Sequence, residues 1–181
     1  MAPRSTASLM QIICDASPWG LGAILVQDGS IIRWIASALT DTDLQVLGVS
    51  RGDCRGQGAF EALAICVAMR EWLPLWQDES TSILVKSDSM AALGALNREG
   101  SSRPLINKVV REIALDLAEG IYNVEVLGHQ PALWNGIADA LSRLDEPEAD
   151  TEFPTSLEGV PRTETAPRPL AWWRSRRSPS G

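Results

Sequence analysis

Four acidic residues of this sequence have apolar or small neighbours, where a carboxylate is costly. Asp15 and Asp88 each come at the end of a short apolar, strand-like run, and Glu61 is the only charged residue in the stretch 59–69. Asp139 lies among glycine, alanine, isoleucine and leucine. Removing a carboxylate from water is unfavourable unless a cation or hydrogen bonds compensate it. The surroundings of these four acids therefore indicate that each carboxylate interacts with a cation or with hydrogen-bond donors.

Each acid also has an ordinary explanation. Asp88 is able to cap a helix, Asp139 suits a helix first turn, and Asp15 is able to begin a turn before Ser-Pro. A buried Glu61 is able to pair with an arginine, and three are available: Arg33, Arg55 and Arg111. Taken singly, none of the acids identifies a site.

Together the four acids indicate a metal site. Two follow strands and two lie near helix starts, so they are able to converge at one end of a sheet. Four ionised carboxylates need counter-charge at short range, and hard oxygen ligands favour Mg²⁺ or Mn²⁺. Two such ions about 4 Å apart activate a water and stabilise the leaving oxygen of a phosphodiester.

Strand-like and helix-like patterns alternate over the first 144 residues. The pair Asp28-Gly29 predicts a tight hairpin, so the first three strands should be antiparallel. The polar, glycine-rich stretch 40–58 is predicted to be a connection. The order predicts an α/β fold, with a mixed five-stranded sheet flanked by helices. The expected elements are strands 10–14, 21–26 and 31–37, helix 57–76, strand 82–86, helices 90–97 and 105–119, strand 124–127 and helix 134–144.

Residues 10–144 are expected to form one domain between two extensions. Residues 1–9 are an N-terminal extension, and six of the chain's 11 prolines lie in residues 145–181. With few apolar residues around them, these prolines predict a disordered tail. The Trp172-Trp173 pair and the basic run 174–177 interrupt it, which leaves a nucleic-acid or partner contact as the alternative.

The composition places limits on function and location. The 181 residues include 16 basic and 23 acidic side chains, a net charge of −7, which taken alone argues against a general nucleic-acid binder. The three cysteines contain no CxxC pair and predict reduced thiols in an intracellular protein, nuclear or cytoplasmic. We expect no membrane partner, because no apolar stretch approaches the roughly 20 residues that span a bilayer.

Four segments resemble the ribonuclease H domain attached to the reverse transcriptases of retroelements. They are CDASPWGLGA at 14–23, EALA at 61–64, KSDS at 86–89 and HQPALWNGIADALSR at 129–143. The resemblance covers residues 10–144. The 46-residue separation of Asp15 and Glu61 differs from proofreading exonucleases, whose first two acids lie two residues apart. The last acid, Asp139, differs from the glutamate that ends the triad of integrase-like transposases.

The resemblance implies a metal-dependent endonuclease that hydrolyses the RNA strand of RNA–DNA hybrids. Asp15, Glu61, Asp88 and Asp139 match the family's ligands for two Mg²⁺ or Mn²⁺ ions. His129 matches the mobile-loop histidine that assists proton transfer or product release. Side chains for reading 2′-hydroxyls of the hybrid are expected at three positions: Ser17, Ser89 and Asn97.

The sequence departs from the family pattern in three ways. Ala132 replaces the usual glycine after His-x-Pro, and the connection 40–58 is longer than in many relatives. The core also lacks a strongly basic helix, so we expect the domain alone to bind the hybrid weakly. An adjoining reverse transcriptase region is expected to supply further contacts with the hybrid. The alternative to an enzyme is a catalytically inactive ribonuclease H-like module with a binding or structural role.

Overall fold

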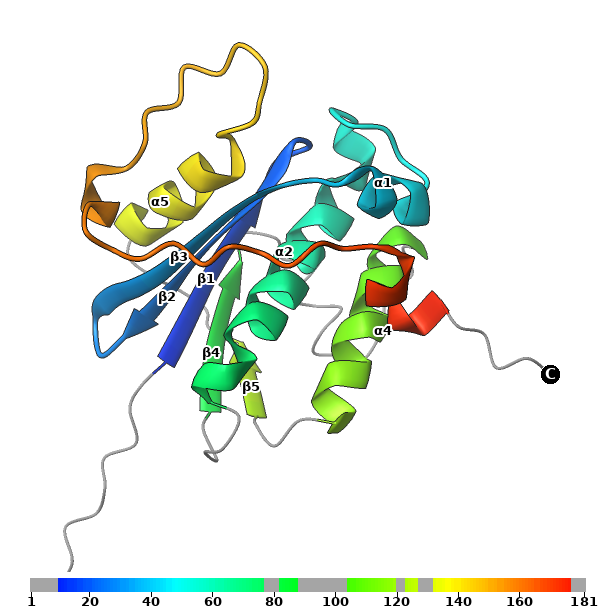
Figure 1. Ribbon diagram of the computed structural model, residues 1–181, viewed down its shortest axis with the longest axis horizontal. Helices are drawn as coiled ribbons and strands as arrows, with labels where there is room; N and C mark the ends of the chain where they lie inside the picture. The colour runs from blue at the N-terminus through cyan, green and yellow to red at the C-terminus, as the bar shows by residue number, and fades with distance from the viewer. Residues whose placement is uncertain (1–9, 77–81, 88–103, 120–122, 127–131, 177–181) are drawn as a thin grey trace, which may run out of the picture.

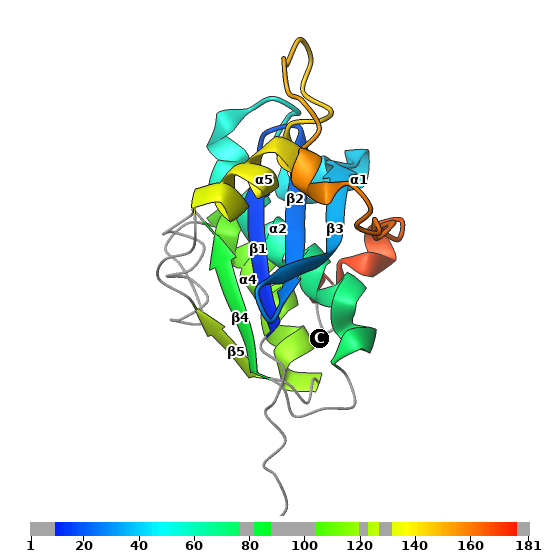
Figure 2. The same ribbon diagram turned by 90° about the vertical axis from the view of Figure 1, so that its left-hand side faces the viewer.

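A mixed sheet of five strands forms the centre of the computed structural model, which describes residues 10–76, 82–87, 104–119, 123–126 and 132–176. The sheet order is β3-β2-β1-β4-β5 (Figures 1 and 2). The first three strands are antiparallel, and β4 and β5 run parallel to β1. The predicted five-stranded mixed sheet is thereby confirmed. The strands are β1 (Met10–Ala16), β2 (Gly20–Gln27), β3 (Ser30–Ala38), β4 (Ser82–Ser87) and β5 (Asn123–Val126).

The hairpin between β2 and β3 has the predicted Asp-Gly turn. Asp28 has φ 49° and Gly29 has φ 85°, so both central residues are in the left-handed region. Glycine adopts that region without strain and aspartate tolerates it. The turn matches the right-handed twist of the strands it joins.

Helices cover both faces of the sheet. Helices α2 (Gln57–Trp72) and α4 (Pro104–Glu119) lie on one face, and α5 (Ala132–Ser142) lies on the other (Figures 1 and 2). Successive side chains of a strand point to opposite faces, so Ile12 packs with α2 whereas Ile13 packs with α5. Among the described residues, no helix is long and apolar enough to cross a membrane.

The stretch 40–58 contains helical structure that the sequence analysis missed. Helix α1 (Asp41–Leu47) begins at Thr40, whose hydroxyl accepts a hydrogen bond from Asp43 N, while the Asp43 carboxylate accepts one from Thr40 N. Helix α1 ends at Gly48, which has φ 69°. A helix this short depends on its caps and its packing rather than on helix propensity. The predicted helix 90–97 lies outside the residues that the structure describes.

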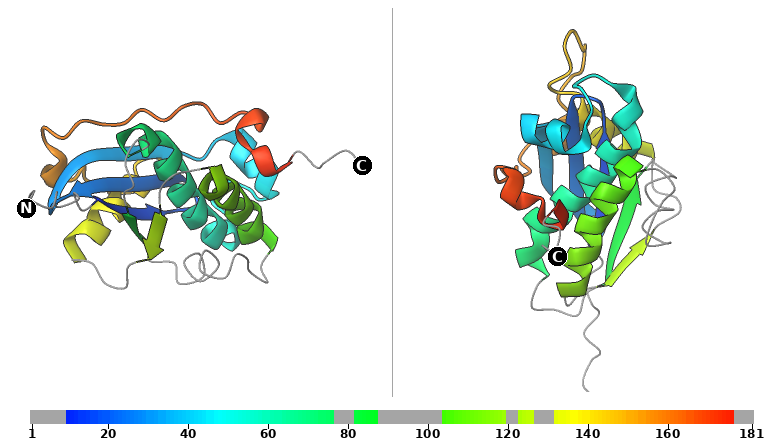
Figure 3. Two further views of the ribbon diagram at one scale, coloured as in Figure 1. Left: turned by 90° about the horizontal axis from the view of Figure 1, so that it is seen from below. Right: turned by 90° about the vertical axis from the view of Figure 1, so that its right-hand side faces the viewer.

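The prediction of a disordered tail is wrong for residues 145–176, which we call the C-terminal strap. The strap leaves α5, follows the outer edge of β3 and then reaches α1, α2 and α4 (Figures 1 and 3). Thr163 N donates to Trp34 O over 2.8 Å, and the side chains of Leu157, Arg168 and Trp173 are buried. These anchors are isolated along the sequence, so they give no periodic pattern. Residues 1–9 and 177–181 are not among those described.

Candidate active site

Asp15 lies at the carboxyl end of the central strand β1. Asp15 is 8% exposed, and its Oδ1 accepts a hydrogen bond from Ala16 N over 2.8 Å. In the antiparallel pair of β1 and β2, Asp15 lies opposite Gly22. On the other side of β1, Cys14 pairs in parallel with Ser87, the last residue of β4. Asp88 follows Ser87 in the sequence but is itself outside the described residues.

Glu61 is attached to the same end of β1 through Gln57. Gln57 Nε2 donates to Glu61 Oε1 over 3.0 Å and to Ala16 O over 2.6 Å. Glu61 is 8% exposed, so both acids are largely removed from water. Sequence reasoning missed Gln57. The signal available was its position four residues before Glu61, on the same face of α2.

Asp139 is positioned by the close approach of α5 to the sheet. Ala138, the residue before Asp139, lies against Gly22 of β2. A Cβ atom added at Gly22 would lie 2.3 Å from Ala138 O. Because Gly22 pairs with Asp15, α5 carries Asp139 to the side of the sheet near Asp15. Arg143 Nε donates to Asp139 Oδ1 over 2.9 Å, and this hydrogen bond raises the pKa of the Arg143 guanidinium.

The donor chemistry of these residues fits divalent ions. Asp15, Glu61 and Asp139 offer hard carboxylate oxygens from three different elements, which is the donor type that Mg²⁺ and Mn²⁺ prefer. Within the described ranges, however, no three His, Cys, Asp or Glu side chains gather closely enough to hold a metal ion. Asp88 and His129, two of the five predicted catalytic residues, lie outside those ranges.

Two further polar groups lie near the end of β1 that carries Asp15: Cys14 of β1 itself and Lys86 of the neighbouring β4. Burial and the neighbouring Asp15 carboxylate raise the pKa of the Cys14 thiol, which keeps it protonated and unsuited to nucleophilic or metal-binding roles. Lys86 of β4 is buried and pairs with Ile13, whose side chain packs toward α5. Since paired residues point to one face, Lys86 places a cation on the face of the sheet that carries Asp15.

Ser17 has a structural role in the turn between β1 and β2. Its side chain donates to Ser142 O over 2.7 Å and accepts hydrogen bonds from Trp19 N and Gly20 N. Ser17 is 1% exposed, so its hydroxyl is enclosed in the protein and does not face a substrate. The other predicted substrate contacts, Ser89 and Asn97, fall in a part of the chain that is not described.

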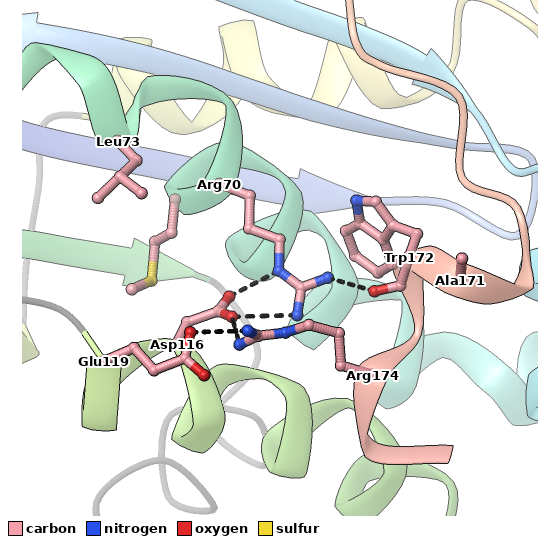
Figure 4. Close-up of a pocket in the computed structure, with 8 residues that line it drawn as sticks. Arg70, Leu73, Asp116, Glu119, Ala171, Trp172 and Arg174 are labelled. Carbon is pink, nitrogen blue, oxygen red and sulfur yellow. Dashed lines mark hydrogen bonds and ion pairs between the residues drawn. The ribbon is translucent and has the colours of Figure 1, made fainter. Parts of the chain in front are cut away.

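A pocket of about 420 Å³ lies elsewhere, between α2, α4 and the strap (Figure 4). Its charged side chains are paired with one another: Arg70 Nε donates to Asp116 over 2.6 Å, and Arg174 Nη1 donates to Glu119 over 2.7 Å. Asp15, Glu61 and Asp139 are not among the residues that line it. The residues that line this pocket hold the strap against α2 and α4.

Comparison with known proteins finds similarity in structure only. No family model matches the chain, and no curated protein matches its sequence. RNase H1 from the halophilic archaeon Halobacterium salinarum matches with a TM-score of 0.54 at 18% identity, over 77% of this chain and 98% of that one. An RNase H1 isolated from compost matches with a TM-score of 0.53 at 14% identity, over 75% and 91% of the two chains.

A third solved structure agrees with these two. The N-terminal RNase H domain of a Mycobacterium tuberculosis protein matches with a TM-score of 0.50 at 13% identity, over 72% of this chain and 95% of that one. At sequence identities of 13% to 18%, the structural similarity establishes the fold alone. The activity has to be argued from the site. With its β3-β2-β1-β4-β5 order and its helices on both faces, the chain has the ribonuclease H fold.

Proposed function

We propose that residues 10–144 form a metal-dependent endonuclease that hydrolyses the RNA strand of RNA–DNA hybrids. The observation that carries the proposal is the placement of Asp15 and Glu61. Both acids are 8% exposed, and the Gln57 amide holds Glu61 beside the end of β1 that carries Asp15. Their carboxylate oxygens are the hard donors that Mg²⁺ and Mn²⁺ prefer. The ribonuclease H fold is the scaffold expected for such a site.

The acids divide the work of the reaction. Two divalent ions, when bound, activate a water and stabilise the leaving oxygen of the phosphodiester. Asp15 would hold both ions, Glu61 and Asp88 the one on the leaving-oxygen side, and Asp139 the one on the water side. His129 would move a proton or assist the release of product. The products would carry 3′-hydroxyl and 5′-phosphate ends.

The expected partner is an RNA–DNA hybrid. The hybrid is a polyanion, and the protein chain that binds it is itself acidic. With a net charge of −7 over its 181 residues, the protein alone should bind the hybrid weakly. We propose an intracellular location and an origin in a retroelement polyprotein, where an adjoining reverse transcriptase region supplies further grip. The resemblance of residues 129–143 to retroelement sequences supports this origin.

A second candidate function is an inactive ribonuclease H-like module that binds hybrid without cleaving it. The ion pair between Arg143 and Asp139 favours this candidate, because a carboxylate satisfied by an arginine has less need of a metal. Both side chains are more than two-fifths exposed, so the pair contributes little stability and a divalent ion would compete with it. We therefore favour the enzyme.

The deciding experiment is cleavage of an end-labelled RNA–DNA hybrid with Mg²⁺ or Mn²⁺. Asp15→Asn, Glu61→Gln, Asp88→Asn and Asp139→Asn should each lose cleavage by at least about 10²-fold, the scale of a lost transition-state stabiliser. Asp150→Asn, a change at an exposed aspartate of the strap, serves as the matched control and should cleave like the wild type.

Three outcomes separate the candidates. Metal-dependent cleavage of the hybrid, with RNA and DNA duplexes left intact, supports the enzyme. Binding of the hybrid without cleavage by the wild type supports the inactive module. Cleavage that survives Asp15→Asn and Asp88→Asn overturns the assignment of the site.

A further inference from the structure

The strap contributes a buried arginine to the core of the fold. Arg168 is 4% exposed, and its Nη2 donates to Asp43 Oδ2 over 2.9 Å, while its Nε donates to the same oxygen over 3.1 Å. The same guanidinium donates to Ser37 Oγ and Ala38 O, each over 3.0 Å. Asp43 is fully buried. A pair enclosed in this way is costly to break, because either partner alone would be an uncompensated buried charge.

Asp43 links Arg168 to the start of helix α1. Its carboxylate also accepts a hydrogen bond from Thr40 N over 3.0 Å, and Asp43 N donates to Thr40 Oγ1 over 3.0 Å. One guanidinium therefore holds the end of β3 and the first turn of α1 together. The first turn of α1 lies in the stretch 39–56, which directly follows β3 and which we call the wall segment.

The wall segment is bonded to the turn that follows Asp15. Leu39 N donates to Trp19 O, and Gly52 N donates to Pro18 O, each over 3.0 Å. The Trp19 ring lies directly against Gly52. The wall segment ends where α2 begins, at Gln57, the residue that holds Glu61. It therefore borders the candidate active site from the β1–β2 turn to the start of α2.

The strap is itself held at points before and after Arg168. Before it, Thr163 N donates to Trp34 O over 2.8 Å. After it, Arg70 Nη1 donates to Trp172 O over 2.8 Å, and Ser175 N donates to the buried Glu112 carboxylate over 3.1 Å; Figure 4 shows the Arg70–Trp172 contact. Arg168 is thus presented by a fixed segment, so it is able to restrain the wall segment.

We propose that Arg168 is a positioning residue, which acts through Asp43 on the wall segment and so sets how this side of the site meets the hybrid. The inference rests on the proposed function. Asp15, Glu61 and Asp139 lie on β1, α2 and α5, outside the wall segment. Loss of Arg168 should therefore weaken substrate binding and leave the chemical step intact.

The test compares Arg168→Gln with Arg162→Gln, which removes another arginine of the strap. Arg162 donates to Ala36 O and lies over Trp34, away from Asp43. Hydrogen exchange of residues 39–56 and the KM and kcat for a labelled hybrid are measured for both. Arg168→Gln should raise KM by roughly 2- to 30-fold, the range of coupling effects between sites, and speed exchange in the wall segment, with kcat unchanged. Arg162→Gln should change neither.

A second variant covers the case in which Arg168→Gln does not fold. The double change Asp43→Asn with Arg168→Gln removes both buried charges and should fold while keeping the raised KM and the faster exchange. Arg168→Lys should bring both the KM and the exchange rate of the wall segment part of the way back to the wild-type values. Unchanged exchange and KM in folded variants overturn the proposal, as does an equal effect of Arg162→Gln. If the wild type fails to cleave hybrid, the proposed function fails, while the exchange data still judge the restraint by Arg168.

Discussion

Gly22 of β2 lies against the backbone of α5, with the position of its missing Cβ atom only 2.3 Å from Ala138 O and 2.7 Å from Ser142 N. Both of these atoms are backbone, so no side-chain rotation relieves the clash that a methyl group would cause. Gly22 also pairs with Asp15. The absence of a side chain at one position therefore sets the separation between the strand that carries Asp15 and the helix that carries Asp139.

Gly22→Ala should move α5 away from the sheet. We expect a loss of about 1–3 kcal/mol in the free energy of unfolding, as for other overpacked sites, and a fall in hybrid cleavage measured at a temperature where the variant is folded. Gly136→Ala is the control: it lies in α5 with nothing within 4 Å of the added methyl and should stabilise the protein by up to about 1 kcal/mol. Equal cleavage by the two variants would contradict this view of Gly22.

The sequence predicted the elements that have a strong local signal. Apolar runs marked the strands, and Asp28-Gly29 marked the hairpin, since each depends on the residues inside it. Helix α1 was missed because seven residues give no periodicity, although the Thr40 and Asp43 spacing of a capping box was present. The order of the strap was missed because Leu157 and Trp173 become core residues only through distant partners.

The site was predictable to the extent that its acids are out of place in apolar surroundings. Asp15 and Glu61 were found in this way and are indeed buried at one end of β1. Gln57 and Arg143 were missed because a glutamine or arginine on a helix is ordinary until its partner is known. Ser17 was predicted to read 2′-hydroxyls of the hybrid, but its hydroxyl accepts hydrogen bonds from Trp19 N and Gly20 N, and a serine after a strand serves such a turn equally well.

Gln57→Ala should lower the rate of hybrid cleavage by about 10- to 100-fold, the usual cost of losing a group that orients a metal ligand. The Gln57 amide links Glu61 to Ala16 O, and its removal takes this hydrogen bond away from the Glu61 carboxylate. The rise in the Mg²⁺ concentration needed for half-maximal rate is the second measurement. Gln27→Ala is the control, because Gln27 pairs with Met10 at the opposite end of β1 from Asp15. A Gln57→Ala enzyme with normal rate and Mg²⁺ dependence would show that Glu61 needs no such support.

The three cysteines should differ sharply in their reactivity toward a thiol reagent. Cys54 is exposed, whereas Cys14 and Cys66 are buried. We expect the native protein to react at Cys54 alone and the denatured protein to react at all three positions. Cys54→Ser should abolish the native reaction. Fast labelling of Cys14 in the native state would show that the strand carrying Asp15 opens readily.

The buried thiols also predict the behaviour of the protein in alkali. Burial raises the pKa of both Cys14 and Cys66 above the ordinary value of 9.0. A raised pKa in the folded state gives stability that is complete below the unfolded pKa and is lost as the pH rises beyond it. The free energy of unfolding should therefore fall above pH 9. Cys66→Ala should make that fall shallower, and an equally steep fall in this variant would contradict the prediction.

Trp173→Ala tests whether the strap is part of the core. The Trp173 side chain is 1% exposed and packs in the cluster that also contains residues of α2 and α4, so its removal should cost about 3–5 kcal/mol of unfolding free energy. Leu170→Ala, three residues earlier and half exposed, should change that free energy by less than about 0.5 kcal/mol. Chemical denaturation of both variants, followed by circular dichroism, gives the comparison. Equal stabilities would mean that residues 145–176 add nothing to the fold, and the restraint that we assign to Arg168 would then lose its anchor.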